Sequence, residues 1–424
     1  MYIYRRAFQL AFTITFLTSH ISASNHPTST AIPFSPGFDI NAVLARATSL
    51  PSHSWEFGTA SEALLELFDA PLAVFGAHPF PVPTVTPANS PSLTYAKEKI
   101  VIGVPPNGLS DGDGAVGDPA SLGVSAVLLG KTDASFAAAA KAEALYVLNQ
   151  APKWPNGAIS HRVMYAELWA DFMYMAPPFL AYYGVASNNA TILQIAVEQC
   201  LLYRQALQAN TTSITATPPN THPASASGLW THILGPVNMD PGIWSTGNAW
   251  AAAGAMRVLA TVAKAPTSLV AKSGGRAWTL KAIGSLVELI SEILNAGIRA
   301  SPDQGLLRNY LDDTTWFGET SGSALLASVA YRLSTFCSLQ KTCPLSKGAT
   351  QTYILWAEHI RHTFGTNDHI TANGTATPAV NPLGWGDRTP YTAGSPEGQN
   401  FVILMYAAWR DCVVAGIPGC KAPL

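Results

Sequence analysis

Charge is scarce in this sequence of 424 residues: Asp, Glu, Lys and Arg together make up only 12% of it, and the formal net charge is −2. A nucleic-acid binder needs a basic surface, so this composition predicts no nucleic-acid partner. Hydrophobic residues account for 48% of the chain, which is ample material for a core. The composition therefore indicates a large globular protein without a polyanionic partner.

The sequence also lacks the motifs of several common enzyme classes. There is no HExxH zinc pair, no GxSxG nucleophile elbow, no GxxxxGK[ST] phosphate loop and no strand followed by GxGxxG. The "DGDG" stretch at Asp111 lacks the later ligands and the terminal Glu of an EF-hand, and we interpret it as a turn. The sequence thus predicts neither a metal nor a cofactor.

One short apolar run lies at the N-terminus, in "MYIYRRAFQLAFTITFLTSHISAS". Arg5 and Arg6 precede apolar residues 7–17, and small residues follow up to Ala23. This order is typical of a secretory signal peptide, and the run is too short to span a bilayer. We expect residues 1–23 to be removed and residues 24–424 to form one secreted, extracellular domain. No later stretch predicts a membrane anchor.

Secretion permits disulfides and glycans. Cys337 with Cys343, and Cys412 with Cys420, are each close enough in sequence to close a short loop, although other pairings remain open. Cys200 lies in a helical, apolar stretch and is predicted to be a buried free thiol. Three Asn-x-Ser/Thr sequons are candidate glycosylation sites: Asn189, Asn210 and Asn373.

Helical periodicity dominates the chain. Long apolar runs such as "STGNAWAAAGAMRVLATVAK" alternate with amphipathic helices such as "AWTLKAIGSLVELISEILNAGI". Buried helices covered by one-sided helices, repeated six times, predict an all-α (α/α)6 barrel; an irregular helical solenoid is the alternative. The best strand signal, "KEKIVIGV" near Lys97, is isolated. Two Pro- and Gly-rich stretches, 77–119 and 209–228, are predicted to be loops on the faces of the barrel.

A polar residue precedes five of the apolar runs. If the inner helices share one direction, these residues meet at one mouth of the barrel; the alternative is that each caps its own helix. The five residues are Asp118, Asp171, Asn248, Glu319 and Glu397.

Asp171 stands out, because it lies in the apolar stretch "ELWADFMYMAPPFLAYYG". Pro177 and Pro178 disfavour a helix interior, which places Asp171 at or just before a helix start. If Glu167 lies one helical turn back, a second carboxylate and an apolar wall raise the pKa of one of the two acids. A carboxyl that stays protonated near neutral pH is a general acid. The alternative role is a salt bridge to Arg162.

The stretch "GLWTHILGPVNMDPGIWSTGNAW", residues 228–250, combines three tryptophans with a histidine and polar side chains. Indole faces stack on sugar rings, and polar tips bind hydroxyl groups, so this pattern favours a sugar subsite; burial in the core is the alternative.

Five motifs in this order, "WADFMYMAPPFLA", "GLWTH", "WSTGNAWAAAGAMRVL", "ETSGSALLA" and "SPEGQNFVILMYAAWRD", resemble glycoside hydrolase family 105, the unsaturated rhamnogalacturonyl hydrolases among the six-hairpin glycosidases. The resemblance runs from about Asp118 to Asp411 and implies an (α/α)6 barrel. It also implies an oligosaccharide substrate whose non-reducing end is a C4–C5 unsaturated uronic acid from a pectin lyase. In that family an aspartate protonates C4 and activates the water that attacks C5.

The resemblance places the catalytic aspartate at Asp171 and its acidic partner at Asp118. The family's W-x-R-G-N-G-W motif departs here at Thr246, so another cation would have to meet the uronate: Arg162, His161 or Arg308. The predicted substrate-binding residues are Trp169, His232, Trp244, Asn248, Trp250, Arg162 and His161. An unsaturated glucuronyl hydrolase and a non-catalytic carbohydrate-binding barrel are the alternative functions.

Overall fold

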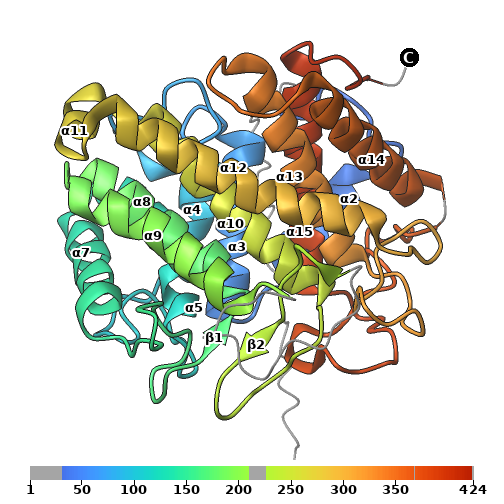
Figure 1. The fold of residues 1–424 in the computed structure, drawn as a ribbon, viewed down its shortest axis with the longest axis horizontal. Helices are drawn as coiled ribbons and strands as arrows, with labels where there is room; N and C mark the ends of the chain where they lie inside the picture. Colours follow the sequence, from blue (N-terminus) through green and yellow to red (C-terminus); the bar gives the residue numbers. More distant parts are fainter. Residues whose placement is uncertain (1–30, 210–225, 367, 423–424) are drawn as a thin grey trace, which may run out of the picture.

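The computed structural model describes residues 31–209, 226–366 and 368–422. The predicted signal peptide, the sequon at Asn210 and most of the predicted loop 209–228 lie outside these residues. The described chain is mainly helical, with its connections gathered at the two ends of a barrel (Figure 1).

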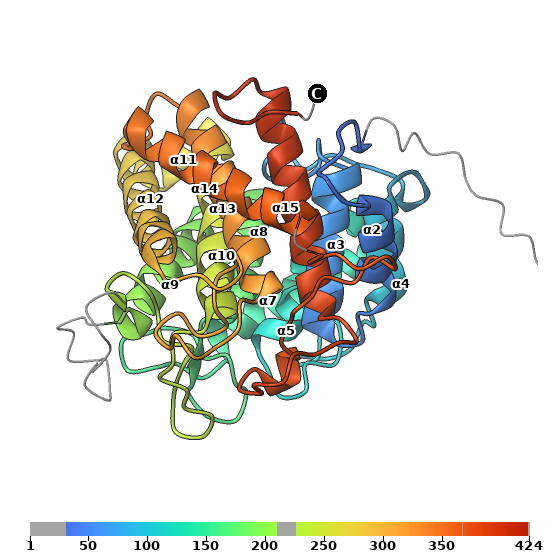
Figure 2. The same ribbon diagram turned by 90° about the vertical axis from the view of Figure 1, so that its right-hand side faces the viewer.

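An inner ring of helices forms the barrel wall. Each helix contacts the next along the chain, and α15 contacts α3, so the ring closes (Figure 2). These helices are apolar on nearly every side; in α10 all residues from Ser245 to Val262 are buried. A helix without a polar face has to be enclosed by other helices. The ring consists of α3 (Ser54–Phe68), α5 (Gly117–Ala120) followed by α6 (Gly123–Leu129), α8 (Phe172–Ala186), α10 (Ser245–Lys264), α13 (Thr320–Leu339) and α15 (Pro396–Val414).

An outer ring covers the inner one. Its helices bury one face each; on α12 the buried residues recur at three- and four-residue steps, as at Ile283, Leu286 and Ile290. Each outer helix packs against an inner helix. The outer helices are α2 (Ile40–Ser49), α4 (Pro91–Lys99), α7 (Ala134–Asn149), α9 (Ala190–Leu207), α12 (Gly275–Arg299) and α14 (Lys347–Thr366), with the short α11 (Thr267–Lys272) before α12. The predicted (α/α)6 barrel is confirmed.

Two details of the sequence interpretation are wrong. "KEKIVIGV" forms no strand, since residues 97–99 end α4 and the following residues are irregular. The predicted loop 77–119 therefore contains an outer helix, because the proline at position 91 starts α4 behind the cap residue Ser90. Among the described residues the named strands are β1 (Leu168–Trp169) and β2 (Ile233–Leu234), which pair antiparallel.

The predicted cysteine pattern is confirmed: Cys337 bonds Cys343, Cys412 bonds Cys420, and Cys200 is a buried free thiol. In the described chain, no helix is both long and apolar enough to cross a membrane.

Candidate active site

The N-terminal ends of several inner helices surround a cavity of about 130 Å³. Its wall combines indole rings with carboxyl groups from segments far apart in sequence. The lining residues are Trp55, Asp113, Asp118, His161, Arg162, Trp169, Asp171, Met175, Trp244, Pro382, Leu383, Trp385 and Glu397. The predicted gathering of acids at one mouth of the barrel is thus found for Asp118, Asp171 and Glu397.

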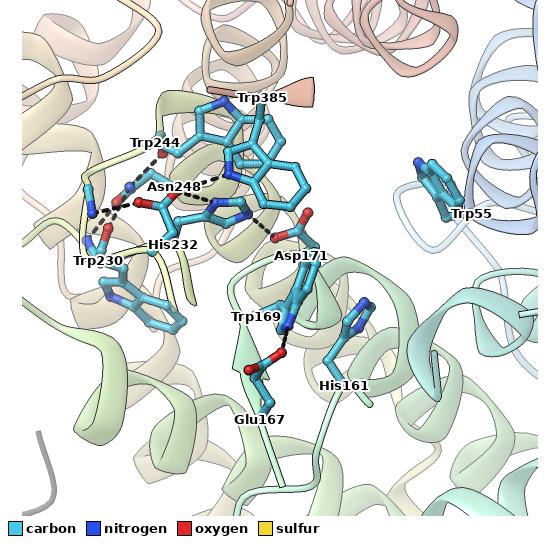
Figure 3. A network of polar contacts seen from close by, with 12 residues as sticks. Trp55, His161, Glu167, Trp169, Asp171, Trp230, His232, Trp244, Asn248 and Trp385 are labelled. Carbon is cyan, nitrogen blue, oxygen red and sulfur yellow. Dashed lines mark hydrogen bonds and ion pairs between the residues drawn. The ribbon is translucent and has the colours of Figure 1, made fainter. Parts of the chain in front are cut away.

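Asp171 immediately precedes α8, as predicted, and Pro177 and Pro178 lie farther inside this helix. Its side chain makes no capping hydrogen bond to the first turn. It forms no ion pair with Arg162 in the described chain; its contact is with His232, whose Nε2 lies 3.3 Å from Asp171 Oδ2 (Figure 3). The carboxylate is therefore held beside the cavity by a histidine rather than by its own helix.

His232 is fully buried and lies between two carboxylates. Its Nδ1 is 2.9 Å from Asp240 Oδ2, while its Nε2 faces Asp171. Burial opposes the charged imidazolium, but Asp171 and Asp240 outweigh it and raise the pKa of His232 to about 8. Asp240 in turn accepts hydrogen bonds from the Tyr310 hydroxyl and from Trp385 Nε1. At neutral pH the Asp171–His232 pair accordingly carries a proton.

Asp118 belongs to α5 and is buried on the same cavity wall. Burial, followed by the charge of Asp171, raises the pKa of Asp118 well above its usual value, while Arg162 acts in the opposite direction. The neighbouring His161, with Nε2 at 3.6 Å from Asp118 Oδ1, is also buried, and burial lowers the pKa of His161 to about 4. His161 is therefore neutral at physiological pH, and burial favours the protonated, hydrogen-bonding form of Asp118.

Glu167 is not the second acid, one helical turn before Asp171, that helical spacing predicted. The chain before Asp171 is the strand β1, so the two carboxyl groups are not one helical turn apart. Glu167 accepts a hydrogen bond from Trp169 Nε1 at 2.8 Å (Figure 3) and further hydrogen bonds from the backbone and side chain of Asn238. Burial opposes ionisation, but these hydrogen bonds outweigh it and lower the pKa of Glu167. Its charge orients Trp169.

The aromatic wall combines expected and unexpected residues. Trp169 and Trp244 line the cavity, as predicted for a sugar subsite. Trp385 and Trp55 were not predicted; the Trp385 ring lies 5.4 Å from that of Trp169 (Figure 3). Trp385 follows "NPLG", a Pro- and Gly-containing loop, which was an available sign of an exposed position. Several flat apolar faces around one small cavity suit a pyranose ring.

The structure does not bring Asn248 and Trp250 to the cavity. Asn248 is fully buried and hydrogen-bonds the backbone of Trp230 and of Trp244, while Trp250 packs against the ring of Tyr174. Both side chains are buried in the helical core, because they belong to the enclosed helix α10. The alternative interpretation, burial, describes them better than a role in the sugar subsite.

The capping alternative describes Glu319, whose carboxylate accepts from the Gly322 N–H and starts α13. Thr246 is buried, with its hydroxyl 3.5 Å from the carboxylate of Glu319. Its side chain therefore brings no cation to the cavity.

Of the three candidate cations, Arg162 and His161 line the cavity and Arg308 does not. Arg308 donates to the backbone oxygens of Trp316 and Pro302. Arg162 donates to the Asp113 carbonyl oxygen at 3.1 Å, and its guanidinium lies 6.0 Å from the Trp169 ring centre. Within the described ranges, no three His, Cys, Asp or Glu side chains are arranged to hold a metal ion.

Similarity to solved structures confirms the fold of the six-hairpin glycosidases. A possible member of glycoside hydrolase family 105 from Salmonella enterica is 16% identical, covers 88% of this chain and 94% of its own, and has a TM-score of 0.59. A glycosyl hydrolase of family 88 from Bacteroides vulgatus is 14% identical over 91% of this chain and 100% of its own, with a TM-score of 0.60. The unsaturated glucuronyl hydrolase of Bacillus sp. GL1 is 14% identical over 90% and 96%, with a TM-score of 0.55.

In sequence, the model of Glycosyl Hydrolase Family 88 matches residues 126–333, just under half of the chain. No curated protein matches the sequence. The matched range contains Asp171, Trp169, His232 and Trp244, while Asp118 lies before it. The protein is a glycoside hydrolase. More particularly, residues 126–333 match the model of family 88, and the chain shares its fold with solved structures of families 88 and 105.

Proposed function

We propose that this protein removes a C4–C5 unsaturated uronic acid from the non-reducing end of oligosaccharides that polysaccharide lyases produce. One observation carries the proposal: the Asp171 carboxylate is free of its own helix, lies against an indole-lined cavity and is paired with His232. A single acid that faces the ring suffices to protonate a carbon–carbon double bond, whereas ordinary glycosidases need two carboxylates at set distances.

In the proposed reaction the proton of the Asp171–His232 pair passes through Asp171 to C4 of the sugar. A water molecule attacks C5, and its proton returns to Asp171, so that one water adds across the double bond. The resulting hemiketal opens and releases the neighbouring sugar. Asp118, whose protonated form burial favours, hydrogen-bonds the water or a ring hydroxyl from the same cavity wall.

Two substrate classes fit this reaction. We propose galacturonate-derived ends from rhamnogalacturonan or pectin, on the strength of the five motifs, and secretion through the N-terminal signal. Ends derived from glucuronate are the alternative, which the similarity to the Bacillus unsaturated glucuronyl hydrolase favours. A panel of both kinds of lyase product, followed by loss of the near-ultraviolet absorbance of the double bond, distinguishes the two.

The variant Asp171→Asn tests the mechanism. The amide keeps the shape of the carboxyl group but donates no acidic proton, so turnover is expected to fall by roughly 100-fold or more. Circular dichroism and sugar binding are expected to remain, since Asp171 caps no helix. Turnover by this variant at the wild-type rate would refute the assignment of Asp171. Binding of the disaccharide by the wild type without any loss of absorbance would instead indicate a carbohydrate-binding barrel.

A further inference from the structure

Glu397 is a buried carboxyl group on the cavity wall to which the proposed reaction assigns no task. It is the second residue of α15 and is only 3% exposed. Ser395, not Glu397, caps this helix. Glu397 Oε2 accepts a hydrogen bond from Trp55 Nε1 at 3.2 Å. Its other oxygen, Oε1, has no hydrogen-bond partner among the described residues, and Glu397 lines the same cavity as Asp171.

The charged groups around Glu397 are almost all acidic. Asp171 faces it from α8, Glu56 from α3 and Glu319 from α13. On α2, which also packs against α15, Arg46 donates to the backbone oxygen of Ala393.

Glu397 forms no ion pair in the described chain. Burial first, and then these carboxylates, raise the pKa of Glu397 well above its usual value. Arg162 and His161 line the cavity as well, but His161 is neutral at physiological pH, because burial lowers its pKa to about 4. These surroundings favour the protonated form of Glu397, which offers a hydrogen-bond donor.

We propose that Glu397 binds the substrate directly, by donating a hydrogen bond from its protonated carboxyl group to the carboxylate of the unsaturated uronic acid. The inference rests on the proposed function. The substrate carboxylate is attached to C5, next to the C4 atom that receives the proton from Asp171, and Glu397 and Asp171 share one small cavity. Thr246 supplies no positive charge here. Protonated Glu397 and the guanidinium of Arg162 would therefore bind the negatively charged uronate in a cavity that is rich in carboxyl groups.

The test compares two kinds of Glu397 variant on the unsaturated digalacturonate released from polygalacturonate by a lyase. Glu397→Gln keeps both the shape and a neutral donor. Glu397→Ala and the volume-matched Glu397→Met remove the donor. We expect the apolar variants to raise KM about 10- to 100-fold, as for a lost hydrogen bond to a charged group, with a smaller change in kcat. Glu397→Gln is expected to restore KM to within about threefold of the wild type.

Glu143→Gln is the matched control, because Glu143 is a buried carboxyl on α7 outside the cavity, and its KM is expected to equal that of the wild type. A wild-type KM in both apolar Glu397 variants would overturn the inference. So would a Gln variant as impaired as Ala, since that result would show that the ionised or purely structural carboxylate matters. If the wild type itself leaves both galacturonate- and glucuronate-derived disaccharides intact, the proposed function fails, independently of Glu397.

Discussion

Asp240 gives the sharpest prediction about how the site controls its proton. Asp240 does not itself line the cavity, although it accepts a hydrogen bond from the lining residue Trp385. Its Oδ2 lies 2.9 Å from His232 Nδ1, and the other nitrogen of His232 faces Asp171. Asp240→Asn keeps the size of the side chain and removes the charge that favours the imidazolium. The variant therefore changes the proton affinity of His232 while leaving the sugar-binding walls in place.

The size of the effect follows from the pKa of His232. Its rise from the usual 6.5 to about 8 corresponds to about 2 kcal/mol in favour of the charged form, shared between Asp171 and Asp240. This stabilisation is fully present below pH 6.5 and is lost as the pH rises through about 8. If removing the Asp240 charge lowers this pKa by about one unit, the alkaline limb of the rate profile moves down by about one pH unit. The protonated fraction of His232 at pH 8 then falls from about one half to about one tenth, and kcat near pH 8 falls about fivefold.

The assay is kcat against pH on the unsaturated disaccharide, together with an NMR titration of the His232 ring. KM at acidic pH should stay close to that of the wild type. Tyr310→Phe serves as a control, because it removes one hydrogen bond to Asp240 but keeps the charge, and it should move the limb less. An unchanged alkaline limb in Asp240→Asn would show that Asp240 only fixes the position of His232, and the electrostatic reasoning would be refuted.

Two further predictions concern stability. Glu143 is buried and forms no ion pair in the described chain. Burial raises its pKa from 4.5 to about 8, although a backbone hydrogen bond from Gly108 opposes the rise. The protonated form therefore favours folding below pH 4.5, and that contribution is lost as the pH rises through 8. The free energy of unfolding in urea of Glu143→Gln, relative to that of the wild type, should therefore rise by on the order of 4 kcal/mol between pH 4.5 and pH 8. The same difference between variant and wild type at both pH values would contradict this. Asn248→Ala should lower the unfolding free energy by about 2–4 kcal/mol, because it leaves the buried backbone N–H and carbonyl oxygen of Trp230 unpaired. Its KM in the folded fraction should not change, and a raised KM would return Asn248 to the sugar subsite.

Local sequence patterns were sufficient to predict the helical barrel. The alternation of apolar and one-sided helices predicted the barrel, because helical periodicity acts within a few residues. Cysteines separated by six and eight positions were also paired correctly, because each pair is close in sequence. The position of Asp171 at the start of α8 was predicted correctly, although Pro177 and Pro178, on which that prediction relied, lie inside the helix. The aromatic stretch around Trp244 correctly indicated an indole wall, although not which indoles would form it.

Which side chains form the cavity depends on closure of the helical ring. It brings Trp55, Trp385 and Glu397 to Asp171 from distant parts of the chain, and the pairing of β1 with β2 places His232 beside it. The same packing turns Asn248 and Trp250 into the core and binds Glu167 to Asn238, where the sequence pattern suggested sugar contacts and a second acid. The sequence alone determined which helices are enclosed, since burial follows from composition and period. Which side chains meet at the mouth depends on contacts between residues far apart in the chain, and only the folded ring specifies those.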